Sequence, residues 1–220
     1  AAAAPAGGEV LVSNKLVAER LQENVARYDK GGEQHYDIIS AFIKSLRGSD
    51  PNAAAYWLAR MVEGGEDPLF IARRMVILAA EDVGLANPNA LLLAQACFDA
   101  VRSVGMPEGR IILAQCAVYL AACPKSNASY MAIENAIAHV RQTGDLPVPL
   151  PLRNAPTKLM KELGYHKGYK YAHDYEENFV EQDFLPEAIA GATYYTPGDN
   201  AKERDIKARL AQLWRGKYGY

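Results

Sequence analysis

Long apolar runs are missing from this chain of 220 residues. The longest one, from Ile111 to Cys123, is interrupted by Gln115 and is shorter than the ~18 apolar residues that suggest a membrane-spanning helix. The start of the chain also lacks the basic segment followed by an apolar one that marks a secretory signal peptide. The sequence therefore predicts no contact with a membrane.

An excess of charge and a cysteine framework are missing as well. The chain has 24 Lys and Arg against 26 Asp and Glu, a formal net charge of -2. This balance excludes a general attraction to nucleic acid, so only a local patch can bind a polyanion. Cys97, Cys116 and Cys123 lack Cys-x-x-Cys spacing and lie in apolar helical patterns. We predict buried free thiols and a reducing compartment.

Catalytic motifs are absent too. The chain has no G-x-x-x-x-G-K-[ST] phosphate loop, no H-E-x-x-H zinc motif and no G-x-S-x-G nucleophile motif. His166 and His173 are seven residues apart in a non-helical stretch, which favours structural or solvated histidines over a metal site. Glu81 and Asp82 are adjacent and cannot share a helix face, so an ion pair with a nearby arginine is favoured over acid–base catalysis. We predict no catalytic, cofactor-binding or metal-binding residue.

Signals for helix starts and stops are frequent instead. Asp50-Pro51, Asp67-Pro68 and Asn87-Pro88 each place a capping oxygen before a proline, which needs no hydrogen-bond partner at the first helical position. Glycines fall where the helices should end, because glycine takes the left-handed closing conformation easily. Apolar residues recur between these signals at helical spacings. The predicted helices lie near residues 14–28, 35–47, 51–63, 68–83, 88–104, 107–122 and 127–142.

Two of these helices are unusual, because residues 69–80 and 111–122 are apolar on nearly every face. A helix that is apolar all round must be covered all round, either by its own chain or by a partner subunit. The short connections favour an array of antiparallel αα-hairpins. We therefore predict an all-α fold.

The character of the sequence changes after residue 145. Four prolines between Leu146 and Pro156 enforce an extended chain. Residues 165–198 are rich in tyrosine and have no helical period, which predicts irregular structure with a turn at Pro186–Ile189 and a short β-hairpin. Asn200 and Glu203 have the spacing of a capping box. Two further helices are predicted, at residues 157–163 and 201–214.

The most suggestive local feature lies at residues 153–171, here called the Lys/Tyr segment, where basic residues alternate with tyrosines. This pattern suits single-stranded nucleic acid, because phosphates meet the cations and bases stack on the rings. The candidate contacts with DNA or a partner protein are Arg153, Lys158, Lys161, Tyr165, Lys167, Tyr169, Lys170 and Tyr171.

Two other interpretations of the Lys/Tyr segment stay open. In the first, the acidic residues that follow neutralise it within the chain and leave a plain surface. These residues are Asp174, Glu176, Glu177, Glu181, Asp183 and Glu187. In the second, Tyr165, His166, Lys170 and His173 form a proton-transfer site, although no nucleophile or cofactor motif accompanies them.

Several long stretches of the chain resemble one protein family. They are His35–Phe42, Asp50–Arg60, Gly65–Arg74, Ala80–Ala86, Ala122–Ala128, Leu152–Glu162, Tyr169–Asp174 and Tyr194-Tyr195. Over about residues 15–215, the chain resembles the C-terminal region of the replication-associated recombination protein A family, also called the maintenance-of-genome-stability family. Its members are clamp-loader-like AAA+ ATPases. Matches at so many places are far more specific than one short motif.

The resemblance implies a division of the chain. Residues 1–12, which begin with four alanines, are predicted to be a linker or the cut boundary of a longer protein. For the rest, the resemblance implies the end of an AAA+ lid helix or linker (13–30), a helical oligomerisation collar (31–145) and an extension packed on the collar (146–220). In this family the collar assembles a homotetramer. ATP and Mg²⁺ belong to a core upstream of this region, so the resemblance implies a DNA-dependent ATPase for the parent protein and no enzymatic activity here.

The resemblance also implies a setting for the whole protein. The parent is expected in the bacterial cytoplasm, associated with the nucleoid. There it would act in replication, recombination and repair at stalled forks, with DNA and single-strand DNA-binding protein as partners.

Overall fold

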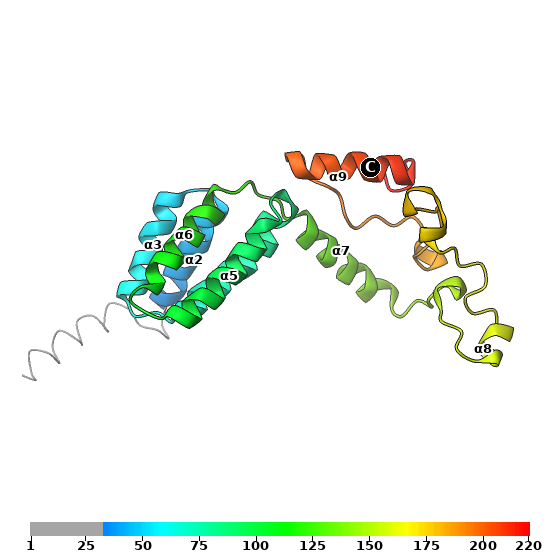
Figure 1. Ribbon diagram of the computed structural model, residues 1–220, viewed down its shortest axis with the longest axis horizontal. Coiled ribbons are helices and arrows are strands. Elements are labelled where there is room, and N and C mark those ends of the chain that lie inside the picture. The colour runs from blue at the N-terminus through cyan, green and yellow to red at the C-terminus, as the bar shows by residue number, and fades with distance from the viewer. Residues whose placement is uncertain (1–32) are drawn as a thin grey trace, which may run out of the picture. The chain divides into compact units, whose positions relative to one another are not determined.

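The computed structural model describes residues 33–220 (Figure 1). Within this range it contains eight α-helices and no β-strand, which confirms the predicted all-α fold. None of the helices between residues 33 and 220 is long and apolar enough to cross a membrane. The helix predicted at 14–28 and the segments predicted at 1–12 and 13–30 lie outside the described residues.

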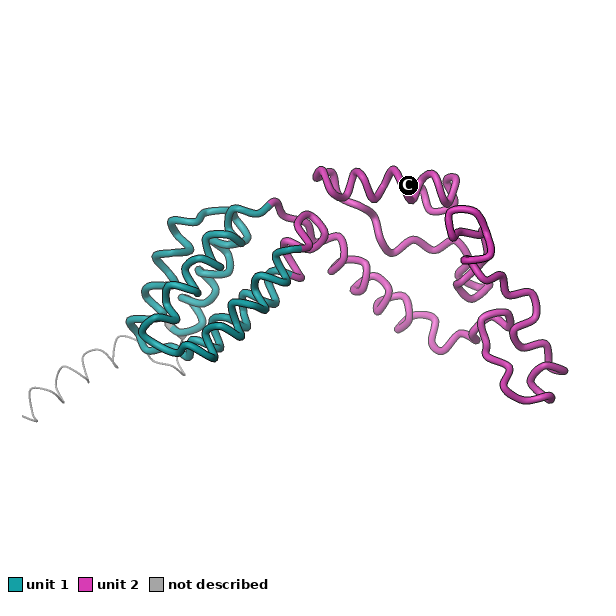
Figure 2. The backbone as a smooth tube through the Cα atoms, viewed as in Figure 1, with its two compact units in different colours: residues 1–79, 89–123 teal, residues 80–88, 124–220 magenta. Residues whose placement is uncertain are grey.

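The chain divides into two compact units (Figure 2). Unit 1 consists of the described residues up to Ala79 together with Asn89–Cys123, and unit 2 of Ala80–Pro88 together with Pro124–Tyr220. The chain thus enters unit 2 at Ala80, returns to unit 1 at Asn89 and enters unit 2 again at Pro124. The helix predicted at 127–142 was assigned to the collar by resemblance, and it lies in unit 2.

Unit 1 is an array of antiparallel helices, as predicted. Chain neighbours pack against each other as hairpins: α2 with α3, α4 with α5, and α5 with α6. The helices are α2 (Glu33–Arg47), α3 (Pro51–Glu63), α4 (Pro68–Leu78), α5 (Asn89–Val104) and α6 (Gly109–Ala122).

The predicted caps begin two of these helices. Asp50 Oδ1 accepts hydrogen bonds from the backbone N–H groups of Asn52 and Ala53, at 3.0 and 2.9 Å. Asp67 Oδ1 accepts one from the N–H of Leu69 at 3.0 Å. In both cases the side chain satisfies donors that the first helical turn leaves unpaired.

The α6 helix explains why its sequence is apolar on nearly every face. It packs against α2, α3, α4 and α5, so most of its circumference is covered within unit 1. Leu113 and Leu120 are fully buried, whereas Ile111 is 63% exposed and Val118 is 45% exposed. The sequence left two possibilities for covering this helix, the same chain or a partner subunit. The same chain covers most of α6.

The helix predicted at 68–83 does not run as one α-helix. The α-helix α4 ends at Leu78, and a π-helical turn, η1 (Ala79–Val83), and a 3₁₀ turn, η2 (Gly84–Ala86), follow it. Gly84 has a φ of 49°, and a Cβ atom there would lie 2.6 Å from the carbonyl oxygen of Ser126. The backbone passes so close to Ser126 that only glycine fits at the turn.

Unit 2 has less regular structure. It contains η1 from Ala80 onward, η2, and the helices α7 (Ala128–Thr143), α8 (Lys158–Glu162) and α9 (Ala201–Trp214), which lie within one residue of their predicted ends. The 3₁₀ turns are η3 (Leu150–Leu152), η4 (Ala172–Asp174), η5 (Glu176–Asn178) and η6 (Glu187–Ile189). The last of these confirms the turn predicted at 186–189.

The predicted β-hairpin within residues 165–198 is wrong. The chain there makes 3₁₀ turns with local hydrogen bonds, such as Asp174 N–H to the Tyr171 carbonyl at 3.0 Å. Glu177 and Asn178 have φ values of 56° and 54°, which reverse the chain and interrupt an extended conformation. Tyrosine favours a strand only where a partner strand offers a surface to pack on.

The C-terminal end of unit 2 is held by an aromatic cluster. The Trp214 ring contacts Phe179, Phe184 and Tyr218, with ring centroids 5.1, 6.4 and 5.0 Å away. Lys217 Nζ lies 5.0 Å from the centre of the Trp214 ring. These contacts join the end of α9 to the irregular chain before η6.

Candidate functional site

The Lys/Tyr segment includes the short helix α8 and the loop after it. Thr157 starts α8, because its Oγ1 accepts a hydrogen bond from the backbone N–H of Met160 at 3.3 Å. The helix ends before Gly164, which has a φ of 83°. Lys158 and Lys161, three residues apart on this helix, are both exposed.

Two of the predicted contact residues bind each other. The Arg153 guanidinium lies over the Tyr165 ring at 5.1 Å, and its Nη1 donates to the Tyr165 hydroxyl at 3.2 Å. Arg153 Nε also donates to the carbonyl of Val148 at 2.7 Å. Both side chains are half-buried. This pair therefore joins the proline-rich stretch to the loop after α8. Arg153 and Tyr165 are consequently less available to bind a ligand.

The other six predicted contacts are exposed. Tyr169 and Tyr171 are 36% and 55% exposed, and their rings lie beside those of His166 and His173, with centroids 5.0 and 5.1 Å apart. The four exposed lysines are Lys158, Lys161, Lys167 and Lys170. Exposed cations beside exposed rings are the arrangement that the nucleic-acid interpretation requires.

The acidic residues that follow do not pair with these lysines within residues 33–220. Among the described residues of the acidic stretch, Asp183 forms an ion pair with Lys217 Nζ at 2.6 Å, near the C-terminal end of unit 2. This hydrogen bond and nearby negative charge raise the pKa of Lys217. In the described part of the chain, neutralisation of the Lys/Tyr segment by direct ion pairs is therefore not observed.

The proposed proton-transfer residues have separate partners. Tyr165 binds Arg153, and His173 Nδ1 lies 3.1 Å from Asn178 Oδ1. His166 lies beside Tyr169, and the Lys170 backbone N–H donates to Gln182. Within residues 33–220, no group of three His, Cys, Asp or Glu side chains is arranged to hold a metal ion. The geometry offers no shared reaction centre.

A buried carboxylate marks a second site, which no catalytic or binding motif in the sequence indicates. Glu203 is 0% exposed, although it lies in the first turn of a surface helix. Its backbone N–H donates to Asn200 Oδ1 at 3.0 Å, which confirms the predicted cap. Its carboxylate receives hydrogen bonds from the side chains of Ser126, Asn200 and Tyr195 and from the backbone of Gly198.

These hydrogen bonds decide the charge of Glu203. Burial alone would raise the pKa of Glu203, but the four donors together outweigh burial and hold the pKa below its ordinary value. Burial and the neighbouring charge of Glu203 raise the pKa of Tyr195 to about 12, so its hydroxyl stays a donor. Unit 2 therefore contains a buried carboxylate that is ionised at neutral pH and hydrogen-bonded.

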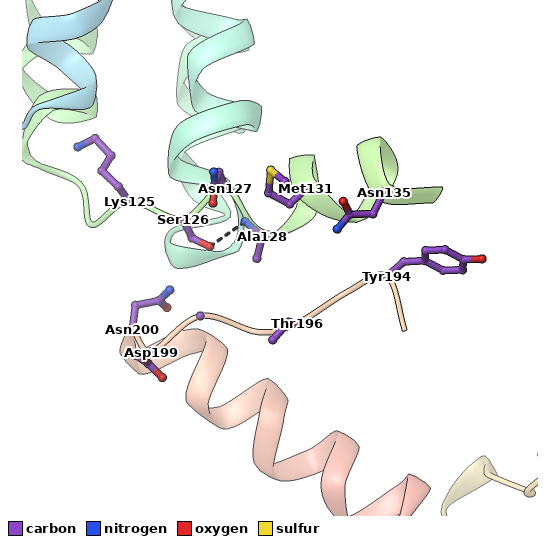
Figure 3. Close-up of a pocket in the computed structure, with 11 residues that line it drawn as sticks. Lys125, Ser126, Asn127, Ala128, Met131, Asn135, Tyr194, Thr196, Asp199 and Asn200 are labelled. Carbon is purple, nitrogen blue, oxygen red and sulfur yellow. Dashed lines mark hydrogen bonds between the residues drawn. The ribbon is translucent and has the colours of Figure 1, made fainter. Parts of the chain in front are cut away.

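Three of the residues that bind this carboxylate, Ser126, Gly198 and Asn200, also line a pocket of about 550 Å³ (Figure 3). One wall is the extended segment 192–199, here called the strap, which leads into α9; the other is the start of α7, with Met131 and Asn135. Tyr194 of the strap also meets α7, because its hydroxyl lies 2.8 Å from His139 Nδ1. The strap therefore covers one face of α7.

The opposite face of α7 is apolar and largely exposed, with Ile137 half-buried. Tyr130, Ile133, Ile137 and Val140 follow each other at spacings of three, four and three, which places them along one side of the helix. Tyr130 is 40%, Ile133 55% and Val140 58% exposed, and no residue of α7 is buried. We refer to these four residues as the α7 stripe.

The α7 stripe was visible in the sequence, but its exposure was not. A stripe at helical spacing normally predicts the buried side of a helix. Here the strap, which lies more than fifty residues further along the chain, covers the other side. Other large apolar side chains of unit 2 are exposed too, namely Val148, Leu150, Leu159, Leu163 and Phe184.

The sequence of this chain matches two protein-family models and several curated proteins. Residues 48–214 match the family model described as MgsA AAA+ ATPase C terminal, and residues 1–47 match a model described as AAA C-terminal domain. Among curated relatives, replication-associated recombination protein A of Coxiella burnetii is 48% identical over 92% of this chain and 46% of its own length.

Two further relatives extend the comparison. The protein of the same name from Escherichia coli is 46% identical over 94% of this chain and 46% of its own length. The ATPase WRNIP1 of Dictyostelium discoideum is 46% identical over 85% of this chain and 22% of its own length. The chain spans about half the length, or less, of these curated relatives.

Proposed function

This chain belongs to the family of MgsA AAA+ ATPase C-terminal regions, and from that membership we propose that it is the collar that assembles such an ATPase into a homotetramer. The observation that carries the proposal is the α7 stripe. The stripe also lies within residues 31–145, which the family resemblance assigns to the collar.

The physical argument rests on the exposed area. Burying a large apolar side chain is worth about 1.5–3 kcal/mol relative to leaving it in water, so a row of them on one helix favours a partner surface. The strap already occupies the opposite face of α7, and a neighbouring copy of the chain is a partner that is always present. A symmetric assembly would use the same stripe in each subunit.

For the whole protein we propose the activities that its relatives' names suggest. An upstream core would bind ATP and Mg²⁺ and hydrolyse ATP, while the region described here would hold the subunits together without a catalytic residue of its own. The assembled ATPase would act on DNA in replication-associated recombination, with single-strand DNA-binding protein as a partner. Its place would be the bacterial cytoplasm, close to the nucleoid.

Sedimentation of the isolated chain tests the assembly proposal. We expect a tetramer at micromolar concentration and a smaller species for Ile133→Asp, because a carboxylate in the stripe must be desolvated in the interface. Ala138→Asp is the matched control: it places the same charge on an exposed position of α7 away from the stripe. A stable wild-type monomer, or equal dissociation of the two variants, would contradict the proposal.

A second function is favoured by a separate observation, the exposed lysines and tyrosines of the Lys/Tyr segment. We propose that this surface binds single-stranded DNA through phosphate contacts and ring stacking, or alternatively an acidic partner protein. Arg153 and Tyr165 would support the loop, since their polar groups already bind each other.

Fluorescence anisotropy with single-stranded and gapped DNA at two salt concentrations tests this second function. Changing Lys158, Lys161, Lys167 and Lys170 together to alanine should abolish binding and reduce its salt dependence. Changing the exposed Lys202 and Lys207 of α9 instead should alter binding little. If the wild-type chain does not bind at low salt, the segment has another role.

A further inference from the structure

Two cysteines of unit 1 face each other across a helical hairpin. The helices α5 and α6 pack antiparallel, and Cys97 lies seven residues before the end of α5 at Val104. Cys116 lies seven residues after the start of α6 at Gly109. Equal distances from the connecting turn bring the two residues to the same level of the hairpin.

The two thiols are in contact. Cys116 donates a hydrogen bond to the Cys97 sulfur, and the Cys97 thiol donates one to the carbonyl oxygen of Ile112, with Sγ and the oxygen 3.8 Å apart. That hydrogen bond lowers the pKa of Cys97, while the same bond together with burial raises the pKa of Cys116. Cys97 is therefore the better nucleophile of the pair, and Cys116 keeps its proton.

Both cysteines border a cavity. Cys97 and Cys116 are only 4% and 1% exposed, yet both line a mainly apolar pocket of about 260 Å³ between α5 and α6. Its other walls are Leu93, Ala96, Ala100, Ile112 and Gln115. A pocket of this size and polarity admits a small uncharged molecule and disfavours an ionic one.

We propose that Cys97 and Cys116 form a modification site that takes a small hydroperoxide and is converted to a disulfide. The Cys97 thiolate attacks one peroxide oxygen; an S–O bond forms, the O–O bond breaks, and the second oxygen leaves as water or an alcohol after taking a proton. The Cys116 sulfur then attacks the Cys97 sulfenic acid, an S–S bond forms, and the hydroxyl leaves with the Cys116 proton as water. The hydroperoxide is reduced by two electrons and the two thiols are oxidised.

Cys123 provides a control within the same unit. It is also buried, 5% exposed, and forms no disulfide, but it lies beyond the end of α6 and does not line the pocket. Burial alone would give all three cysteines the same low reactivity. The proposal instead predicts reaction at two positions in a fixed order.

Mass spectrometry of the reduced chain after treatment with hydrogen peroxide tests the proposal. Wild type and Cys123→Ser should each lose two hydrogens, and peptide mapping should join the peptides of Cys97 and Cys116. Cys116→Ser should instead accumulate a sulfenic acid at Cys97 that dimedone traps. Cys97→Ser should give neither product.

Three results would overturn the proposal. They are an unchanged wild-type mass, a disulfide that includes Cys123, and a trapped sulfenic acid at Cys116 before Cys97 reacts. Because the wild-type chain itself reports on the disulfide, the test does not depend on any variant folding. Circular dichroism of the three serine variants shows whether a missing product reflects lost chemistry or a lost fold.

Discussion

Units 1 and 2 bury different kinds of side chain. Among the described residues, every buried apolar side chain except Val83, Ala86 and Pro197 belongs to unit 1. Unit 2 instead buries the carboxylates of Asp82 and Glu203 and leaves the α7 stripe in solvent. Apolar burial is non-directional, whereas a buried charge requires each of its hydrogen-bond donors in place. Unit 1 should therefore depend less than unit 2 on pH and on polar side chains, although it too contains a nearly buried ion pair, His35 Nδ1 to Glu66 Oε2 at 2.8 Å.

The two tryptophans make this contrast measurable, because one lies in each unit. Trp57 belongs to α3 of unit 1, and Trp214 belongs to α9 of unit 2. Replacing either one by phenylalanine leaves a fluorescence signal from the other unit alone. Urea unfolding of dilute protein can then be followed separately in each unit.

Leu120→Ala should give the largest effect. Leu120 is 0% exposed in α6, so its loss removes apolar burial and leaves a cavity, at a cost of about 2–5 kcal/mol in the free energy of unfolding. The loss should appear in the Trp57 signal. Leu159→Ala, the same change at a residue that is 64% exposed in unit 2, should stay within about 0.5 kcal/mol. Equal costs at the two sites would remove the distinction between the units.

Glu203→Gln should give the second largest decrease in the free energy of unfolding. The change keeps the shape of the side chain but removes the charge that four donors surround, and hydrogen bonds to charged groups are worth about 1.5–3 kcal/mol. The Trp214 transition should move to lower urea while the Trp57 transition stays in place. Glu187→Gln, at an exposed position of unit 2, is the matched control. A shift of the Trp57 transition alone would show that Glu203 does not stabilise its own unit.

The same contrast explains which features the sequence could predict. The ends of the unit 1 helices were predicted within two residues, apart from the end of α4, because caps, glycines and helical spacing act over neighbouring positions. The Asn200–Glu203 cap was predicted for the same reason. The burial of Glu203 was not, because Ser126 reaches it from a distant part of the chain.

The candidate site shows the same limit. The pattern of the Lys/Tyr segment identified exposed cations and rings, but it could not distinguish Arg153 and Tyr165, which bind each other. Their pairing depends on the fold of the proline-rich stretch, which has no periodic signal. The π-helical turn at Ala79–Val83 was missed for a similar reason: it directly precedes Gly84, whose backbone lies against the distant residue Ser126.

Acid should weaken unit 2 before unit 1. The pKa of Glu203 is lower in the folded state than its ordinary value of 4.5, so its contribution is fully present above that pH. It is lost as the pH falls through the lower, folded-state pKa. The Trp214 midpoint should therefore fall with pH in this acid range more steeply than the Trp57 midpoint. In Glu203→Gln the extra slope should disappear; if it persists, another carboxylate is responsible.

Lys217→Met should give the smallest decrease in the free energy of unfolding. It tests whether the aromatic cluster stabilises unit 2. Lys217 bonds to an exposed carboxylate, Asp183, and lies over the Trp214 ring. Exposed ion pairs and cation–π contacts are each worth about 0.5–1 kcal/mol, so the total loss should be small. Asp183→Asn removes the ion pair and leaves the rings in contact. If Asp183→Asn lowers the free energy of unfolding as much as Lys217→Met does, the ion pair accounts for the loss. If Asp183→Asn has no effect, the contact of the Lys217 cation with the Trp214 ring accounts for it. In that case unit 2 contains one patch that aromatic contacts stabilise.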